Sequence, residues 1–277
     1  MYKIIDRQDL SSVIHLFKID APEIAQKARA GQFVIVRIDE KGERIPLTFA
    51  DWDAKAGSVT IIFMEAGATT CRMARLNSGD SLMNFVGPLG IPAHIEKFGT
   101  VVCVGGGIGV APITPIATAL KRAGNWVISI MGARNKGLLF WEDKLSHSSN
   151  ELIVTTDDGS YGRQGLVTEP LKEVLVSRKI DRVIAIGPIP MMKYCAATTQ
   201  PFGVTTIVSL NPLMVDGTGM CGCCRVSVGG ATRFACVDGP DFDGHKVDWD
   251  LMTVRSKAYS VEEKVSMEKW QCQCKSK

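Results

Sequence analysis

The chain lacks two features that would place it in or beyond a membrane. None of its apolar runs reaches the ~18 residues that a membrane-spanning helix needs. The segment Met1–Gln8 has neither the apolar stretch nor the small-residue cleavage site of a secretory signal peptide. We therefore expect a cytoplasmic protein without a membrane span.

The chain also has little excess charge and few histidines. Its 32 Lys and Arg residues against 29 Asp and Glu give a net charge of +3, and no basic stripe alternates with aromatic residues. This balance argues against a nucleic acid as partner. Only 4 histidines are present, and none lies in the glycine-rich loops described below. We therefore assign no catalytic acid or base.

Cysteine, by contrast, is plentiful and unevenly distributed among the 277 residues. A chain of this length corresponds to about two domains at ~150 residues each and needs no disulfides to fold. In a cytoplasmic protein, cysteines indicate metal binding or redox chemistry. Cys103 and Cys195 lie in apolar or helical contexts, so we expect them to be buried and hydrophobic. We assign no role to Cys272 and Cys274 in the polar tail.

The first hundred residues predict an antiparallel β-barrel. Short β-branched or aromatic runs occur at Val13–Ile19, Phe33–Ile38, Ser58–Met64 and Ser81–Val86, and turn signals separate several of them. Closure into a barrel removes the exposed edges of such a sheet. We expect one short helix after Asp20, with this residue as N-cap and a proline in the first turn.

From about residue 100 the pattern changes to alternating strands and helices, which predicts a parallel sheet covered on both faces. The expected strands are Thr100–Gly105, Trp126–Met131, Glu151–Thr156, Arg182–Gly187 and Gly203–Leu210, and the expected helices are Val110–Ala123, Leu138–Leu145, Leu166–Ser177 and Met191–Thr199. Ligands of such sheets bind at the carboxyl ends of the strands.

Three glycine-containing loops follow strands of this sheet. The run Gly105–Pro112 opens a helix, where backbone N–H groups and the helix dipole favour a phosphate, although it is not the Gly-x-Gly-x-x-Gly fingerprint. Asp157 and Asp158 begin the second loop, and Gly187–Met191 forms the third. The strand–loop–helix context of the first loop favours a phosphate over an ordinary turn, whereas the second and third loops are each more simply explained as turns. Three such loops at one sheet edge favour a nucleotide site.

Two segments of the barrel region are further candidates for phosphate binding. Arg44 and Thr48 lie on one extended face, so the cation could contact a phosphate while the hydroxyl bonds a polar ring edge. For this segment alone, a surface arginine on a strand is the simpler reading. Gly67, Thr69 and Thr70 lead into a helix and add hydroxyl groups to backbone donors.

The strongest local signal is the group Cys221, Cys224 and Cys236, which indicates metal binding. With Asp216 the spacing is Asp-x4-Cys-x2-Cys-x11-Cys, which matches the Cys-x4-Cys-x2-Cys…Cys of plant-type 2Fe–2S sites with Asp in the first seat. Soft thiolates suit iron–sulfur clusters and also zinc, and the spacing favours the cluster. Asp216 could instead form a turn with Gly217, which would leave Cys223 as fourth ligand.

Taken together, the ordered motifs resemble the ferredoxin-reductase-like flavoproteins. They are Arg44-x-Pro-x-Thr48, Gly67-x-Thr-Thr70, Gly87-Pro-Leu-Gly90, Gly105-Gly-Gly-Ile-Gly-x-Ala-Pro112, Gly187-Pro188 and the cysteine motif. Within this family the chain is similar to the electron-transfer subunits related to that of dihydroorotate dehydrogenase. It is most similar to their branch in NADH-dependent ferredoxin:NADP⁺ oxidoreductases, also called sulfide dehydrogenase beta subunits, where aspartate is accepted at the position of Asp216.

The resemblance implies three cofactors and the residues that bind them. FAD would lie between the barrel and the nucleotide domain, against Arg44, Pro46, Leu47, Thr48, Gly67, Thr69 and Thr70. NAD(H) would face Gly105, Gly106, Gly107, Gly109, Asp157, Asp158, Gly187, Pro188 and Met191. A 2Fe–2S cluster would be held by Asp216, Cys221, Cys224 and Cys236. Arg134 would suit NADP, but the two aspartates would repel its 2′-phosphate, and the resemblance favours NAD(H).

The resemblance also implies a domain order and an activity. We assign residues 1–98 to an FAD-binding β-barrel, 99–210 to an NAD(P)-binding α/β domain, 211–252 to a small iron–sulfur cluster domain and 253–277 to a tail. The expected activity is exchange of hydride between NAD(H) and FAD, and of single electrons with the cluster and a large flavin/iron–sulfur partner subunit, with ferredoxin reached through that partner. The alternatives are the electron-transfer subunit of dihydroorotate dehydrogenase and a non-catalytic redox sensor.

Overall fold

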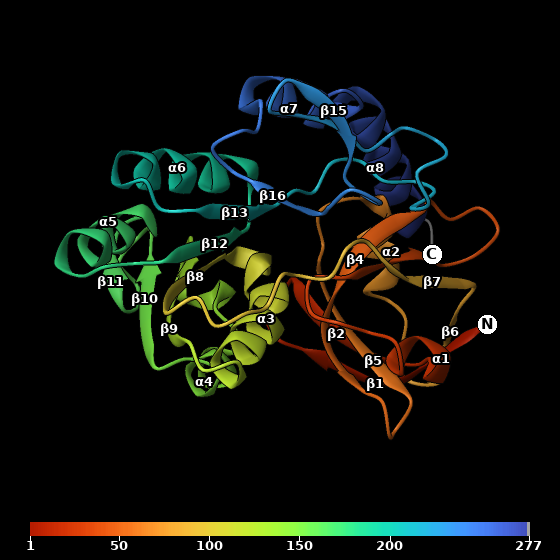
Figure 1. The fold of residues 1–277 in the computed structure, drawn as a ribbon. Helices are drawn as coiled ribbons and strands as arrows, with labels where there is room; N and C mark the ends of the chain where they lie inside the picture. Colours follow the sequence, from red (N-terminus) through yellow and green to blue (C-terminus); the bar gives the residue numbers. More distant parts are fainter. Residues whose placement is uncertain (276–277) are drawn as a thin grey trace.

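The computed structural model describes residues 1–275 and contains two seven-stranded sheets joined by a C-terminal region. In Figure 1 the N-terminal sheet lies at the lower right, the second sheet at the left, and the C-terminal region spans the top of both. This order of barrel, α/β sheet and cysteine-rich region is the one that the sequence predicts.

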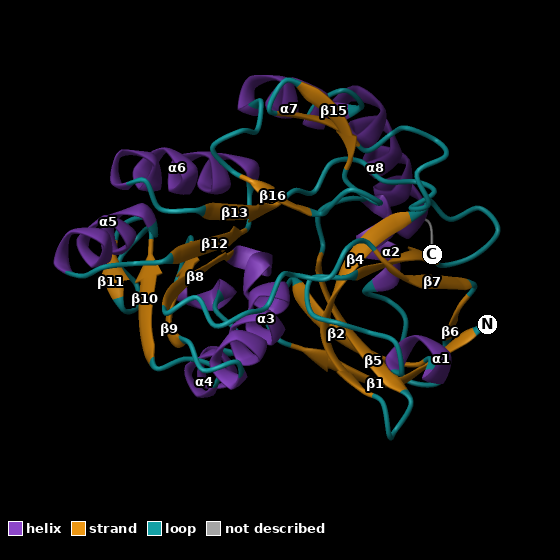
Figure 2. Cartoon of the chain, in the orientation of Figure 1, coloured by secondary structure: helices purple, strands orange, loops and turns teal. Residues whose placement is uncertain are grey.

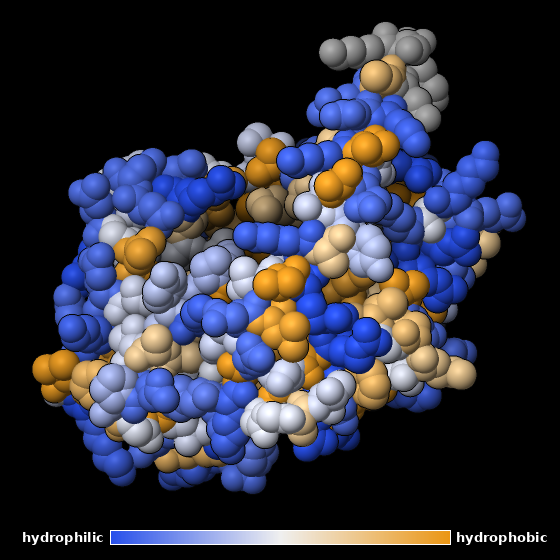
Figure 3. Space-filling view, turned by 90° about the horizontal axis from the view of Figure 1, so that it is seen from above, coloured by the Kyte–Doolittle hydropathy of each residue, from blue (hydrophilic) through white to orange (hydrophobic). Residues whose placement is uncertain are grey.

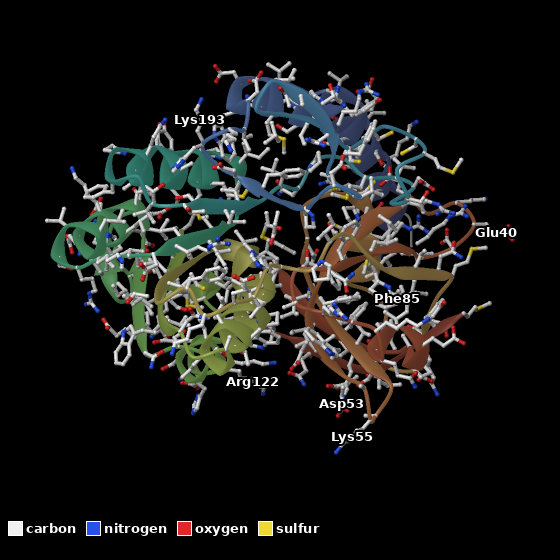
Figure 4. All side chains as sticks on the ribbon, in the orientation of Figure 1. Glu40, Asp53, Lys55, Phe85, Arg122 and Lys193 are labelled. Carbon is white, nitrogen blue, oxygen red and sulfur yellow. The ribbon has the colours of Figure 1, made fainter. Side chains whose placement is uncertain are left out.

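The N-terminal sheet is a nearly closed antiparallel barrel with the strand order β6-β1-β2-β5-β4-β3-β7. Its elements are β1 Tyr2–Asp9, β2 Ile14–Asp20, α1 Pro22–Ala25, β3 Phe33–Arg37, β4 Ile45–Asp53, β5 Ser58–Met64, α2 Ala68–Met73, β6 Ser81–Leu82 and β7 Asn84–Leu89. Strands β6 and β7 are one residue apart in the chain but lie at opposite ends of this order, so the sheet must curl until its edges meet. Buried aromatic rings, among them Phe85, fill the interior (Figure 4).

Two local expectations for the barrel need correction. Asp20 is the last residue of β2, and the N-cap of α1 is Ala21, which makes no side-chain capping hydrogen bond. The proline does lie in the first turn, as expected. The predicted run Ser81–Val86 is divided between β6 and β7, because the chain passes there from one end of the sheet to the other.

The second sheet has the order β11-β10-β9-β8-β12-β13-β16 and is parallel except at its last strand. Its elements are β8 Thr100–Gly106, α3 Val110–Arg122, β9 Trp126–Ala133, α4 Glu142–His147, β10 Glu151–Thr156, β11 Arg163–Gln164, α5 Thr168–Ser177, β12 Arg182–Ile186, α6 Ile189–Thr199, β13 Thr206–Ser209 and β16 Asp241–Asp243. Short 3-10 helices cover Gly107–Gly109, Lys136–Leu138 and Gln200–Phe202.

Helices cover both faces of this sheet, as the apolar strands predict (Figure 2). Side chains of α3 and α4 pack on one face, and those of α5 and α6 on the other. Cys103 and Cys195 are fully buried among apolar side chains, which confirms their expected role. Burial raises the pKa of both thiols to about 12.

The C-terminal region is joined to both sheets. It contains the hairpin β14 Arg225–Val228 and β15 Ala231–Phe234, then β16, α7 Trp249–Ser256 and α8 Ser260–Lys275. Strand β16 pairs antiparallel with β13, so this region supplies the last strand of the second sheet. Lys193, on α6 in Figure 4, lies 2.8 Å from Asp250 of α7.

Further contacts hold this region against the barrel. One apolar core contains Phe33 of the barrel, Val208 of β13 and Ala235 after β15. Helix α8 lies beside α2, and the Arg75 guanidinium is 4.5 Å from the centre of the Trp270 ring. Among the residues that the structure describes, no helix is long and apolar enough to cross a membrane.

Candidate functional site

The glycine run after β8 and the loop after β12 come together at the carboxyl edge of the second sheet. A Cβ atom on Gly109 would lie 2.1 Å from the carbonyl oxygen of Ile186, and one on Gly106 would lie 2.2 Å from Met191 Sδ. Glycine is therefore required at 109, where the clash would be with backbone, whereas at 106 only the Met191 side chain would have to move. Gly107 has φ +54° and no neighbouring atom within 4 Å of an ideal Cβ, so its backbone faces open space.

The acidic pair after β10 lies at the same edge of the sheet but farther along it. Asp157 and Asp158 are exposed, and their N–H groups donate to the carbonyls of Ala133 and Arg134 at the end of β9. The Asp158 carboxylate accepts hydrogen bonds from the backbone and hydroxyl of Ser160, which lower the pKa of Asp158. The Asp158 carboxylate thus stabilises the turn in which it lies. The pair follows β10, which is two strands from β8 and the glycine run.

The barrel candidates lie at the start of β4. Arg44 precedes the strand and is exposed, whereas Pro46, Leu47 and Thr48 are half-buried and pair with β3. Arg44 is close enough to Asp216 of the cysteine-rich loop to help lower the pKa of that carboxyl. Two segments far apart in the sequence, each singled out separately, therefore lie side by side.

The second barrel candidate forms the N-terminus of α2. The Thr70 hydroxyl accepts hydrogen bonds from the N–H groups of Ala66 and Gly67, at 2.9 and 3.0 Å. Gly67 is the N-cap, with extended backbone and no atom within 4 Å of an ideal Cβ. The Thr69 hydroxyl donates to the Glu43 carboxylate. Glu43, next to Arg44, was not singled out from the sequence, because a carboxylate is not expected at a phosphate site.

The cysteine-rich loop brings two thiols together and directs backbone amides at the sulfurs. Cys224 and Cys236 are buried, with 3.2 Å between their sulfur atoms, and burial is the main cause that raises the pKa of Cys236 to about 12. The pKa of Cys221 is lowered, chiefly by the N–H of Cys223 and also by those of Asp216 and Val215. The N–H of Gly219 likewise favours the Cys236 thiolate.

Asp216 organises the same loop. Its carboxylate accepts hydrogen bonds from the N–H and hydroxyl of Thr218 and from the N–H of Met220, and the Thr218 bonds are the main reason that the pKa of Asp216 is lowered. The next residue, Gly217, has φ +84° and packs so closely on the barrel that a Cβ would lie 2.7 Å from Leu89 and 2.9 Å from Ile35. The loop is thereby seated on strands β3 and β7.

Within the described residues, no three His, Cys, Asp or Glu side chains converge closely enough to hold a single metal ion. A 2Fe–2S cluster makes a different demand, since its four ligands are shared between two irons. The close pair Cys224 and Cys236, with amides aimed at the sulfurs of Cys221 and Cys236, is a donor set that fits such a cluster.

The surface around the cysteine loop is apolar, a feature that sequence reasoning missed. Exposed hydrophobic side chains at Leu213, Val215, Met220 and Val237 surround the loop, and Met220 is 88% exposed. Figure 3 views the molecule from the side of the C-terminal region and shows such groups in a mainly hydrophilic surface. Four apolar residues spread over 25 positions form no periodic pattern, so only the folded loop reveals them.

A pocket of about 330 Å³ lies beside the exposed thiols and is lined by Cys221, Cys223, Arg225 and Arg255, among others. The Arg255 guanidinium donates to the carbonyl oxygens of Cys223 and Arg225, both at 3.1 Å. Helix α7 thus fixes the backbone on the far side of the cysteine loop.

Comparison with known proteins agrees with this geometry. The iron–sulfur cluster binding domain of dihydroorotate dehydrogenase B matches residues 211–248. A Thermotoga maritima homolog of the dihydroorotate dehydrogenase B (NAD⁺) electron transfer subunit is 46% identical over 97% of this chain and 95% of that protein. The electron transfer subunit of Geobacillus thermodenitrificans is 34% identical over 81% of this chain and 88% of that protein.

Among solved structures, one of the NADH-dependent reduced ferredoxin-NADP oxidoreductase, determined to study flavin-based electron bifurcation, superimposes with a TM-score of 0.94. It is 44% identical, and the match covers 98% of each chain.

Proposed function

Because the chain belongs to the family of dihydroorotate dehydrogenase B electron-transfer subunits, we propose that it exchanges hydride between NAD(H) and FAD and single electrons between FAD and a 2Fe–2S cluster. The observation that carries the proposal is the position of the cysteine-rich loop, which packs against the barrel. Gly217 packs on Ile35 and Leu89 of the barrel, and Asp216 lies near Arg44. The proposed cluster ligands are thus next to the proposed flavin residues.

The flavin residues are those at the start of β4 and α2. We propose that Arg44 neutralises the pyrophosphate and that Thr48 bonds the ring edge, with Pro46 and Leu47 packing beside it. Gly67, Thr69 and Thr70 form the second phosphate contact. The open space in front of Gly67 supports this assignment, because a phosphate needs close approach to the backbone there. Thr69 must release Glu43 in order to bond a phosphate.

The nicotinamide nucleotide is assigned to the loops at the carboxyl edge of the second sheet. We propose that Gly105, Gly106, Gly107 and Gly109 face its phosphates, with Gly187, Pro188 and Met191 on the opposite side. The contact of these two loops and the open backbone at Gly107 support this placement. Asp157 and Asp158, two strands away, are assigned to the far end of the nucleotide, where their charge disfavours a 2′-phosphate and hence favours NAD(H).

The cluster is assigned to two pairs of ligands, one pair for each iron. Cys224 and Cys236 form the first pair, since their sulfurs are already adjacent. Asp216 and Cys221 form the second pair. Backbone N–H groups of Val215, Gly219 and Cys223 would stabilise the bound thiolates, as hydrogen bonds to sulfur do in iron–sulfur proteins.

Flavin supplies the hydride and single-electron chemistry when it is bound, so the work of this chain is to position the cofactors. The glycine loops would hold the phosphates of the nucleotide, and the close packing of Gly217 on Ile35 and Leu89 would keep water from the space between barrel and cysteine loop. No acid or base is needed for these transfers.

Within the family, we propose a role as the small subunit of an NADH-dependent ferredoxin:NADP⁺ oxidoreductase. The support is the 44% identity to such a structure along nearly the whole chain. The exposed apolar residues around the cysteine loop would face the large flavin/iron–sulfur subunit. The alternative is that this partner is a dihydroorotate dehydrogenase.

One experiment tests the activity and another the partner. The purified protein should have the spectrum of flavin plus 2Fe–2S cluster, and NADH should bleach it rapidly. Cofactors that neither NADH nor NADPH reduces would indicate a redox sensor instead. Affinity purification from the native host, followed by mass spectrometry, identifies the large subunit, and recovery of a dihydroorotate dehydrogenase would contradict the oxidoreductase assignment.

A further inference from the structure

A buried histidine in the barrel lies between two carboxylates. The imidazole of His15, on β2, is only 6% exposed. Its Nδ1 lies 2.7 Å from Asp9 Oδ1 on β1, and its Nε2 lies 2.8 Å from Glu65 Oε1, just after β5. The ring of Phe63, 5.5 Å away between centroids, also packs against it. Both nitrogens can donate at once only when the ring is doubly protonated.

These contacts continue to the other side of helix α2. Arg7 donates to Asp9 at 3.1 Å and also to the carbonyl oxygen of Leu76 at 2.9 Å. The series Arg7, Asp9, His15 and Glu65 therefore contacts the chain on both sides of α2: Glu65 precedes the N-cap Gly67 by two residues, and Leu76 follows the C-terminus. The N–H of Glu65 is fixed as well, because it donates to the Val13 carbonyl at 2.9 Å.

We propose that His15 is a positioning residue for the phosphate-binding segment 65–70. This inference rests on the proposed function, because that segment contains the flavin residues Gly67, Thr69 and Thr70. The contact of His15 Nε2 with the Glu65 carboxylate holds Glu65 toward the barrel interior and so fixes the point from which the chain enters α2.

The test compares two flavins on protein from which flavin has been removed. FAD contacts the phosphate-binding segment, whereas riboflavin has no phosphate. We expect His15→Gln to weaken FAD binding about tenfold, in the range expected for losing a hydrogen bond to a charged group, and to leave riboflavin binding unchanged. Both are measured by the quenching of flavin fluorescence during titration.

The charged groups that face the His15 ring are Asp9 and Glu65, with Arg7 behind Asp9. Asp9 is held ionised, since hydrogen bonds from His15 and Arg7 lower its pKa.

The chain contains a matched control in His94, which also pairs with a carboxylate, that of Glu96 at 2.7 Å, but is 61% exposed. His94→Gln should change neither affinity. Glu65→Ala tests the same link from the other side, because alanine cannot bond the ring, and it should weaken FAD binding as well, even if His15→Gln does not fold. Equal losses for FAD and riboflavin, or unchanged FAD affinity in both variants, would overturn the proposal. Wild-type protein that binds no flavin would overturn the proposed function itself.

Discussion

The substitution Gly107→Val tests whether the glycine run binds a nucleotide or serves only as a turn. Gly107 has φ +54° and open space around an ideal Cβ, so the side chain meets no protein atom. The left-handed backbone costs an L-residue about 1–2 kcal/mol. For a protein of this size, ~1 kcal/mol lowers the melting temperature by about 2–4 °C, so the variant should remain folded.

The effect on the nucleotide should be far larger than the effect on stability. A β-branched side chain at Gly107 would occupy the space through which the proposed phosphates approach the backbone, and we expect KM for NADH to rise more than about tenfold, the loss of a charge-assisted hydrogen bond or more. The flavin absorption spectrum should be unchanged, because the proposed flavin residues lie at the starts of β4 and α2.

Gly203 provides the control for strain. It has φ +64°, and an ideal Cβ there also meets no atom within 4 Å, but it follows a 3-10 helix outside the glycine loops. Gly203→Val should therefore lower the melting temperature by a similar amount and leave NADH kinetics unchanged. Normal NADH kinetics in folded Gly107→Val protein, or equal rises of KM in both variants, would refute the assignment of this loop to the nucleotide.

Three further predictions follow from the site and from one buried carboxyl. Arg44→Ala should retain less FAD after gel filtration, since a contact with pyrophosphate contributes about 1.5–3 kcal/mol, and equal flavin content would contradict this role. Asp216→Cys should keep a 2Fe–2S cluster with a shifted potential, Asp216→Ala should impair its assembly, and Cys223→Ser should have little effect. An electron paramagnetic resonance signal lost in Cys223→Ser but intact in Asp216→Ala would reverse that assignment. Burial raises the pKa of Asp241 from 3.8 to about 6, so its ionisation destabilises the folded state by up to about 3 kcal/mol as pH rises through 4 to 6. Asp241→Asn should accordingly raise the free energy of unfolding at pH 8 and not at pH 4, as urea titrations would measure.

The strands and helices with continuous apolar patterns could be predicted closely from the sequence. The predicted strand Glu151–Thr156 coincides with β10, and the predicted helix Val110–Ala123 exceeds α3 by one residue, because the short apolar run of the strand and the long apolar face of the helix are plain in the sequence. Strand β1 is mostly polar, with Lys3 and the run Asp6–Asp9, and it lacks the apolar or alternating pattern that would predict a strand. Strand β16 has three residues, too few for any periodicity.

The candidate site was predictable where the chemistry is local and not where it depends on contacts between segments. Spacing alone grouped Cys221, Cys224 and Cys236. Gly109 contacts Ile186 because strands β8 and β12 are neighbours in the sheet, and the order of strands in a sheet cannot be read from the sequence. Nothing in the sequence links His15 to Glu65, because they are 50 residues apart and strands β3, β4 and β5 lie between them.

The antiparallel pairing of β16 with β13 determines how this chain can be divided. A cut after Leu210 would remove Phe242 from beside Val208 and leave one side of β13 without a hydrogen-bonded neighbour. Open strands of this kind recruit other chains and aggregate. A fragment holding only barrel and nucleotide sheet would therefore be insoluble, and a stable one must extend through Asp243 and so retain every cysteine of the loop. The cysteine-rich segment of this molecule therefore cannot be removed, or acquired, without a change in the last strand of the second sheet.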